Sequence, residues 1–173
     1  MRQIAPKTKV IAVQELMTRD VQTCTPDDTL DVPARMMWDH DCGCIPVVDQ
    51  NAYVVGMITD RDICMATYIQ GIALKALRVS NAMSREVFAC RPEDSVGVAE
   101  NIMQEHRVRR LPVVAMDGRL VGILSLNDLA REAAREHVPP RREVGPEGLV
   151  ETLATICEPR RSGHGAAASA SAG

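Results

Sequence analysis

Two short polar motifs in this chain, Thr59-Asp60-Arg61-Asp62 and Ser125-Leu126-Asn127-Asp128, could bind a sugar and a phosphate. In each motif a hydroxyl residue follows an apolar stretch, and an aspartate comes three positions later. A carboxylate can accept hydrogen bonds from both hydroxyls of a ribose, and the free N–H groups of a helix start favour anions. The same spacing also forms a capping box, in which the two side chains only close their own helix end. For either motif alone, both interpretations stay open.

An internal repeat places the two motifs at the same register, which favours a function beyond helix capping. Residues 17–64 align with residues 83–130 at a constant offset of 66 positions, and fifteen of the 48 pairs are identical. A duplication of this kind predicts two copies of one structural unit, in which each copy covers the apolar face that the other leaves bare. The space between the copies is then the natural place for a ligand.

Each copy is expected to fold as a β-α-β-β-α unit, which makes the chain an α/β (α+β) protein. The prediction depends on hydrophobic periodicity and turn residues. The first copy is expected to have a strand at 21–23, a helix at 30–40, strands at 44–48 and 53–59, and a helix from there to residue 70. The second copy is expected to have a strand at 87–89, a helix at 96–106, strands at 110–115 and 119–124, and a helix at 126–137.

This pattern divides the chain into six segments. Residues 1–12 are a lead-in, 13–71 the first repeat, 72–78 a linker and 79–137 the second repeat. Residues 138–161 are a C-terminal extension with one short helix predicted at 149–157. Residues 162–173 are rich in Gly, Ala and Ser and are expected to be disordered.

Composition argues against several classes of function. A net charge of −3 and only four aromatic residues predict no binding to nucleic acid. The chain has no run of 18 apolar residues and no apolar signal segment near its start, so we expect a cytoplasmic protein without membrane contact. It also has no Walker loop, nucleophile elbow or metal-binding His-Glu motif, so we expect no enzymatic activity.

The six cysteines supply the main alternative function. In a cytoplasmic protein they are expected to be thiols, and small buried fillers are the default. Cys42-Gly43-Cys44 has one intervening residue, whereas zinc sites use two to four and a second pair, so no metal site is predicted. The alternative is a redox- or stress-responsive protein that acts through Cys24, Cys42, Cys44 and Cys90 without nucleotide.

As a set, the repeated motifs resemble a tandem pair of CBS domains, the family named for cystathionine β-synthase. The marks of that family are a leading Met-Thr/Ser, a Pro-x-Asp turn, an apolar-Pro-Val-Val strand and a closing Gly-x-x-Thr/Ser-x-x-Asp. They occur at Met17, Pro26, Pro46 and Gly56, and again at Met83, Pro92, Pro112 and Gly122. The resemblance covers about residues 13–137. It implies a stand-alone, bacterial-type CBS protein with two units packed sheet to sheet into one pseudo-two-fold pair, and commonly a flat homodimer.

The resemblance also implies a function, because the cleft of such a pair often binds an adenosyl compound. The expected regulatory ligand is AMP, ADP, ATP or S-adenosylmethionine, with no covalent cofactor, and the regulated effector protein acts in trans. By motif, Thr59 and Asp62 would hold one ribose, and Ser125 and Asp128 the other. The remaining implied ligand-binding positions are Cys42, Gly43, Cys44, Ile45, Val108, Arg109, Arg110, Leu111, Arg19 to Val21 and Arg85 to Val87.

Positive charge distinguishes the two predicted sites. The segment 106–110 carries three arginines, whereas its counterpart 40–44 carries none, and Arg61 lies inside the first motif. Arginine suits paired contacts with phosphate oxygens, so the site that joins Thr59, Arg61 and Asp62 to Arg109 and Arg110 is expected to bind phosphate better. The alternative is that these arginines form only a solvated helix end, where the dipole favours positive charge. The other site, next to the uncharged Cys42-Gly43-Cys44, suits a less charged ligand or none.

Overall fold

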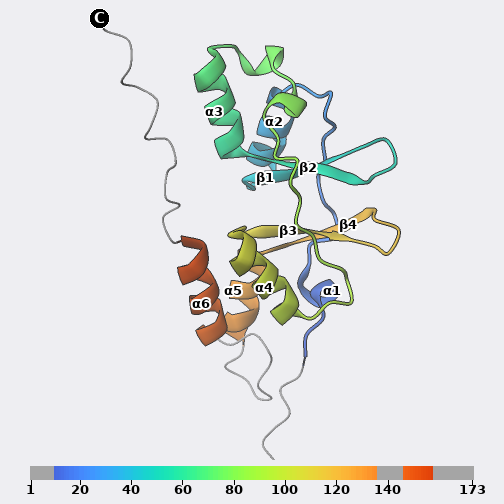
Figure 1. Cartoon of the computed structure of the whole chain (residues 1–173), viewed down its shortest axis with the longest axis vertical. Helices are drawn as coiled ribbons and strands as arrows, with labels where there is room; N and C mark the ends of the chain where they lie inside the picture. The colour runs from blue at the N-terminus through green and yellow to red at the C-terminus, as the bar shows by residue number, and fades with distance from the viewer. Residues whose placement is uncertain (1–9, 136–145, 158–173) are drawn as a thin grey trace, which may run out of the picture.

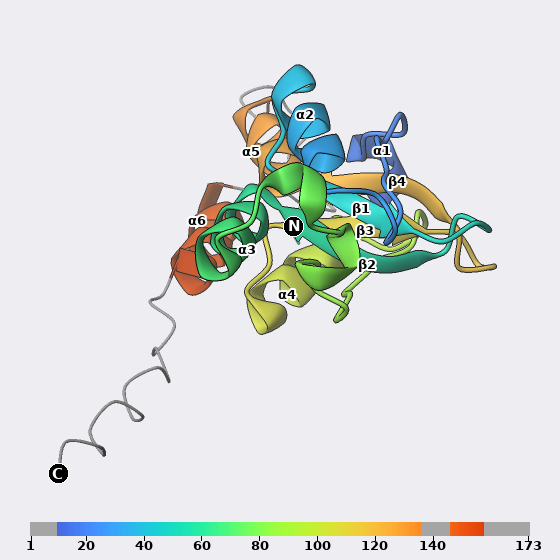
Figure 2. The same cartoon turned by 90° about the horizontal axis from the view of Figure 1, so that it is seen from above.

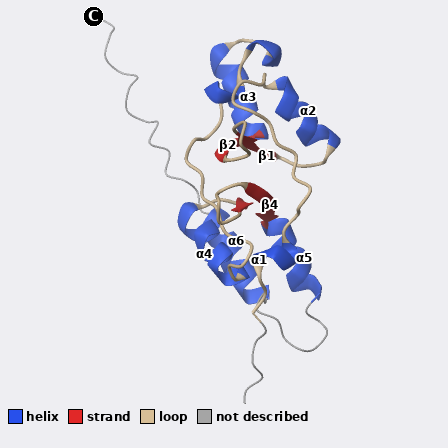
Figure 3. Ribbon diagram, turned by 90° about the vertical axis from the view of Figure 1, so that its right-hand side faces the viewer, coloured by secondary structure: helices blue, strands red, loops and turns tan. Residues whose placement is uncertain are grey.

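Two small antiparallel sheets lie between two layers of helices in the computed structural model, which describes residues 10–135 and 146–157 (Figures 1 and 3). Repeat 1 contributes α2 (Asp31–Asp39), β1 (Cys44–Val48), β2 (Val54–Thr59) and α3 (Asp60–Gln70). Repeat 2 contributes α4 (Val96–His106), β3 (Arg110–Val114), β4 (Leu120–Ser125) and α5 (Leu126–Arg135). The predicted mixed α+β class with sheets facing each other is therefore confirmed.

Short helices and one late helix complete the described chain. They are α1 (Val13–Leu16), the 3-10 turns η1 (Leu74–Ala76) and η2 (Val79–Asn81), and α6 (Pro146–Cys157). The late helix was predicted from residue 149 and begins one turn earlier, at a proline, which is well suited to a first helical position. The expected end of α5 near residue 137 and the expected disorder of 162–173 lie outside the described residues.

The prediction of strands at 21–23 and 87–89 is wrong. Each is reduced to a single parallel bridge, Cys24 with Val47 and Cys90 with Val113. In repeat 1 the bridge consists of Cys24 N–H donating to the Pro46 oxygen at 3.2 Å and Val48 N–H donating to the Cys24 oxygen at 2.9 Å. The next rungs would need N–H groups from Pro46 and Pro26, and proline has none. Pro112 and Pro92 occupy the same positions in repeat 2, so neither ladder can lengthen.

The two repeats exchange their leading segments. Thr18 pairs with Ile123 of β4 through two backbone hydrogen bonds of 3.0 and 2.9 Å, and Ser84 pairs with Met57 of β2 through two of 2.9 Å. The hydrophobic clusters follow the same rule. Ile11, Val13 and Met17 are buried with core residues of repeat 2. In the same way, Leu77, Val79 and Met83 are buried with core residues of repeat 1. Each core is therefore built from both halves of the chain.

Glycine makes this exchange possible at one position of each hairpin. A Cβ on Gly56 would lie 2.8 Å from both the Met83 Sδ and the Ser84 carbonyl oxygen. A Cβ on Gly122 would lie 2.6 Å from the Met17 Sδ and 3.0 Å from the Thr18 oxygen. Because a backbone atom blocks the space in both cases, a larger residue would push the leading segment off the strand.

The hairpins also meet each other, on the side away from the helices (Figures 1 and 2). Tyr53 and Arg119 form an isolated antiparallel β-bridge, and Leu120 N–H donates to the Ala52 oxygen at 3.0 Å. This contact leaves the opposite ends of the strands, where β2 enters α3 and β4 enters α5, beside the helices. Among the described helices, none is long and apolar enough to cross a membrane.

We expect Gly56→Ala and Gly122→Ala each to lower the free energy of unfolding by about 1–3 kcal/mol, because the added methyl overpacks the exchanged segment. Urea denaturation would measure the loss. Gly148→Ala is the matched control, since the nearest atoms to its Cβ are the Glu100 carboxylate oxygens at 4.0 Å. Alanine inside helix α6 should leave stability equal or raise it by up to about 1 kcal/mol. Equal stability of all three variants would contradict a tight exchange.

Candidate functional site

The first polar motif lies where strand β2 passes into helix α3. Thr59 is the N-cap, and its N–H and hydroxyl both donate to Asp62 Oδ2, at 3.0 and 2.6 Å. The Asp62 N–H donates back to Thr59 Oγ1 at 3.2 Å. The motif is thus a capping box, as one of the two interpretations required. Only one carboxylate oxygen is engaged, and within the described part of the chain Asp62 Oδ1 has no hydrogen-bond partner.

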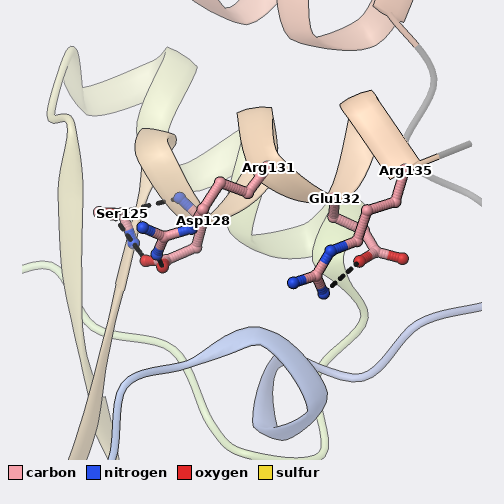
Figure 4. Close-up of polar contacts among 5 residues, drawn as sticks. All are labelled: Ser125, Asp128, Arg131, Glu132 and Arg135. Atoms are coloured by element: carbon pink, nitrogen blue, oxygen red, sulfur yellow. Dashed lines mark hydrogen bonds and ion pairs between the residues drawn. The ribbon is translucent and has the colours of Figure 1, made fainter.

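The second motif has the same cap but no spare oxygen (Figure 4). Ser125 N–H and Oγ donate to Asp128 Oδ2 at 2.8 and 2.6 Å, and the Arg131 guanidinium binds Asp128 Oδ1. Asp128 is 6% exposed. The repeat-1 counterpart of Arg131 is Met65, which cannot form such an ion pair. The two aspartates, alike in sequence, therefore differ in whether they can accept a further hydrogen bond.

Arg110 of repeat 2 reaches the first motif across the pseudo-two-fold axis. The Arg110 Nη2 lies 3.8 Å from the position that a Cβ on Gly43 would occupy, and Asp60 Oδ2 lies 3.1 Å from the same point. Strand register supports this arrangement, because Cys44 pairs with Thr59 and Arg110 pairs with Ser125 at matching ends of the two sheets. A guanidinium, a free carboxylate oxygen and a helix N-terminus thus meet where β1 begins and β2 ends.

The pKa of the Cys44 thiol is influenced by the same cluster of charged groups. Burial raises the pKa of Cys44 to about 12, Arg110 opposes the shift, and Cys42, Asp62 and Asp60 add to it. The charged groups that act on this sulfur therefore come from both repeats. Asp60 was missed by the sequence prediction. The one available signal was its place between Thr59 and Arg61, where repeat 2 has the apolar Leu126.

The remaining predicted residues are distributed over other surfaces. Arg109 is exposed, and its carbonyl oxygen accepts from Leu126 N–H at 3.0 Å. The Arg19 and Arg85 guanidinium groups donate to the carbonyl oxygens of Gln14 and Ser80, at 3.1 and 3.3 Å. Arg61 is exposed, Val87 is half-buried, and Val108 packs against the core of repeat 2.

Three of the predicted residues line cavities in the described chain, and they fall into two different ones. Arg19 and Val21 line one of about 140 Å³ beside the hairpin tips, together with Val48 and Leu120. Cys42 and Asp60 line another of about 760 Å³, which is formed by residues of α2, α3 and the segments next to them. The larger cavity is therefore a groove between helices that shares Asp60 with the Thr59–Asp62 cluster.

Cysteines Cys24 and Cys90 occupy equivalent buried places beside β1 and β3. Burial, helped by Asp28 and Asp94 respectively, raises the pKa of each thiol to about 12. All six cysteines are free thiols. Since the thiolate is the reactive form, these two residues and Cys44 are suited to packing and poorly suited to redox chemistry near neutral pH.

Comparisons with known proteins agree with this architecture. The model of the family described as CBS domain matches residues 13–68 and 79–135. The CBS domain-containing protein YhcV of Bacillus subtilis is 41% identical over 119 residues, covering 69% of this chain and 83% of YhcV. The chain belongs to the CBS domain family.

Two similar proteins of known structure extend the comparison. Hypoxic response protein 1 of Mycobacterium tuberculosis is 29% identical over 146 residues, covering 84% of this chain and 94% of its own length. The crystal structure of Hypoxic Response Protein I, with two coordinated zinc ions, has a TM-score of 0.64 and covers 75% of this chain and all of that chain. Among the described residues here, no three His, Cys, Asp or Glu side chains gather to hold a metal.

The CBS domain pair of protein MJ0100, in complex with 5-methylthioadenosine and S-adenosyl-L-methionine, has a TM-score of 0.64. It covers 71% of this chain and 95% of its own length. At 23% identity it shows a shared fold.

We expect the buried thiols of Cys24, Cys44 and Cys90 to react with iodoacetamide at pH 8 about 100- to 1000-fold more slowly than the exposed Cys157. A pKa near 12 leaves a far smaller thiolate fraction. Peptide mass spectrometry after timed alkylation would give the rates, and urea-unfolded protein is the control in which all sites react alike. If Cys24 or Cys90 in the folded protein reacted as fast as Cys157, the result would contradict this prediction and support the redox alternative.

Proposed function

We propose that this chain is a regulatory module that binds an adenosyl nucleotide beside Thr59 and Asp62, in the space between the two CBS repeats. The observation that carries the proposal is Asp62 Oδ1, which has no hydrogen-bond partner among the described residues and is held in place by the capping bonds of Oδ2. A fixed, unpaired carboxylate oxygen is a ready acceptor for a ribose hydroxyl. The MJ0100 pair, bound to 5-methylthioadenosine and S-adenosyl-L-methionine, supports an adenosyl compound as the ligand class.

Arg110 is the proposed phosphate contact. Its guanidinium approaches Gly43 and the acidic Asp60, so an incoming phosphate would compete with Asp60 for the same positive charge. A phosphate with two negative charges and three acceptor oxygens is the stronger partner for a guanidinium fork. Arg109 and Arg61 are exposed near this edge and would add longer-range attraction.

Ser125 and Asp128 form the weaker of the two proposed sites. Both oxygens of Asp128 are engaged, so a ribose there would have to displace Arg131 or share its oxygen. We therefore propose that nucleotide occupies the Thr59–Asp62 side first. The predicted positions around Cys42, Val87 and Val108 would supply apolar contacts, which is what an adenine ring needs.

The proposed output is regulatory, through an effector protein in trans and without catalysis. A ligand that contacts both repeats favours the arrangement in which those contacts form, by its difference in affinity between the two states. Catalytic motifs are absent from the sequence, as described above. We further propose a cytoplasmic location without binding to nucleic acid, on the grounds of charge and composition. The redox alternative is disfavoured by the raised thiol pKa values of Cys24, Cys44 and Cys90.

We expect Asp62→Ala to abolish most of the nucleotide-induced rise in melting temperature, because it removes the free acceptor. A panel of AMP, ADP, ATP, NAD and S-adenosylmethionine in a thermal-shift assay would test this. In the wild type, a hundredfold excess over Kd should add about 2.7 kcal/mol of stability. Asp128→Ala is the matched control: it loses the same kind of cap but should keep most of the shift. If Asp128→Ala lost the thermal shift and Asp62→Ala kept it, the ligand would bind beside Ser125 and Asp128 instead.

Arg110→Ala should weaken binding of AMP and ATP by about 10- to 100-fold while affecting adenosine little, because a hydrogen bond to a charged group contributes roughly 1.5–3 kcal/mol. Isothermal titration calorimetry would give the affinities. Arg109→Ala, which removes an exposed guanidinium next to it, should cost less. Equal losses for adenosine and ATP in Arg110→Ala would refute the phosphate assignment.

A further inference from the structure

The first N–H groups of helix α3 all have partners within the chain. Thr59 N–H donates to Asp62 Oδ2 at 3.0 Å, and Asp62 N–H donates back to Thr59 Oγ1 at 3.2 Å. Asp60 N–H donates to the Gly43 oxygen at 3.4 Å, and Arg61 N–H donates to Asp60 Oδ1 at 2.7 Å. The N–H groups that a helix start leaves open are thus used from the N-cap to the third helical position. Charge on a ligand is therefore recognised here by side chains.

Two side chains of opposite charge, Asp60 and Arg110, approach one point beside Gly43. Asp60 Oδ2 lies 3.1 Å and Arg110 Nη2 lies 3.8 Å from the position that a Cβ on Gly43 would occupy. Arg110 lowers and Asp60 raises the pKa of the buried Cys44 thiol, so both charges act at the first residue of β1. Because glycine has no side chain, residue 43 leaves the space between the two charged groups open.

Repeat 2 shows that the helix cap does not require an acid at this position. The counterpart of Asp60 is Leu126, whose N–H donates to the Arg109 oxygen at 3.0 Å, just as that of Asp60 donates to the Gly43 oxygen. Leu126 is 7% exposed and packs in the core of repeat 2. The same turn therefore forms without a carboxylate, which leaves the Asp60 carboxylate available for a role in binding.

We propose that Asp60 is a specificity-determining residue of the nucleotide site, which selects ligands by the charge on their 5′ group. This role rests on the proposed function, since it takes the ribose to be held by Asp62 with the 5′ group toward Gly43 and Arg110. Asp60 repels an anionic 5′ group, such as a phosphate, and attracts a cationic one, such as the sulfonium of S-adenosylmethionine. Arg110 acts in the opposite direction.

The pair of charges suits a 5′ group that carries both signs. The methionine part of S-adenosylmethionine has a carboxylate for Arg110 and a sulfonium for Asp60, whereas AMP has only the phosphate. Asp60 is exposed and Arg110 is half-buried, so water and salt screen both charges. For two unit charges about 5 Å apart under such screening, removal of one changes affinity by roughly 4- to 20-fold.

Asp60→Asn tests this role, because asparagine keeps the shape of the side chain and an oxygen that can accept from Arg61 N–H. Isothermal titration calorimetry would compare two matched pairs of ligands. AMP and adenosine differ by the phosphate. S-adenosylmethionine and S-adenosylhomocysteine differ at the sulfur by one methyl group and one positive charge.

In Asp60→Asn we expect AMP to bind roughly 4- to 20-fold more tightly and S-adenosylmethionine to bind more weakly by a similar factor. Adenosine and S-adenosylhomocysteine should each change less than about twofold, because neither carries a net charge next to C5′. Both effects should shrink when NaCl is raised from about 0.05 to 0.5 M, since salt screens exposed charges.

Asp117→Asn is the matched control. It removes the same charge from an exposed residue in the turn between β3 and β4, so all four affinities should stay unchanged. An equal response of Asp117→Asn and Asp60→Asn would attribute the effect to net charge and overturn the role of Asp60.

Two further outcomes separate this role from the proposed function. Binding of all four ligands with affinity ratios that do not change in Asp60→Asn would refute charge selection and leave the nucleotide site intact. If none of the four bound either the wild type or Asp60→Asn, the nucleotide site itself would be refuted, and charge selection with it.

Discussion

The exchange of leading segments between the two repeats is the constraint on which the rest of the structure depends. Four backbone hydrogen bonds, two at Thr18–Ile123 and two at Ser84–Met57, tie each hairpin to the other half of the chain. Two-stranded sheets are marginal on their own, so the additional pairing with the exchanged segment stabilises each of them. The same pairing fixes the two sheets face to face. It thereby sets the distance between the first residues of β1 and β3, where Cys44 and Arg110 lie.

Duplication makes two sites alike, and a few substitutions then make them different. Thr59 and Asp62 form the same cap as Ser125 and Asp128, and the distance from hydroxyl to carboxylate oxygen is 2.6 Å in both. Yet Arg131 binds the second oxygen of Asp128, whereas Met65 leaves that of Asp62 without a partner among the described residues. A single difference in side chain, arginine in one helix and methionine in the other, thus decides whether the second carboxylate oxygen of the aspartate already has a partner.

The helical ends of the two repeats also differ, although they arose from the same repeated unit. Both repeats fold a helix pair with an apolar groove, but within residues 10–135 and 146–157 only repeat 2 has a further helix, α6, packed on that pair. Large apolar side chains are retained on the open face and replaced by polar or small ones on the other face. This correlation is the expected result if an exposed groove remains stable only where it has a partner to exclude water.

The sequence by itself determined the repeat, the α+β class, the hairpins and the main helices, because these depend on local periodicity, caps and turns. The prediction of strands failed at 21–23 and 87–89. These residues favour extended structure, but prolines on both sides of the single bridge prevent further backbone hydrogen bonds. The sequence could not show that Ile11, Val13 and Met17 are buried with repeat 2, since a contact between segments so far apart in the chain leaves no local signal. Tertiary structure alone brought Asp60 and Arg110 together and separated Arg19 and Val21 from them. Those outcomes depend on which side chains meet across the two-fold axis, and the geometry of that meeting is fixed only when both halves have packed.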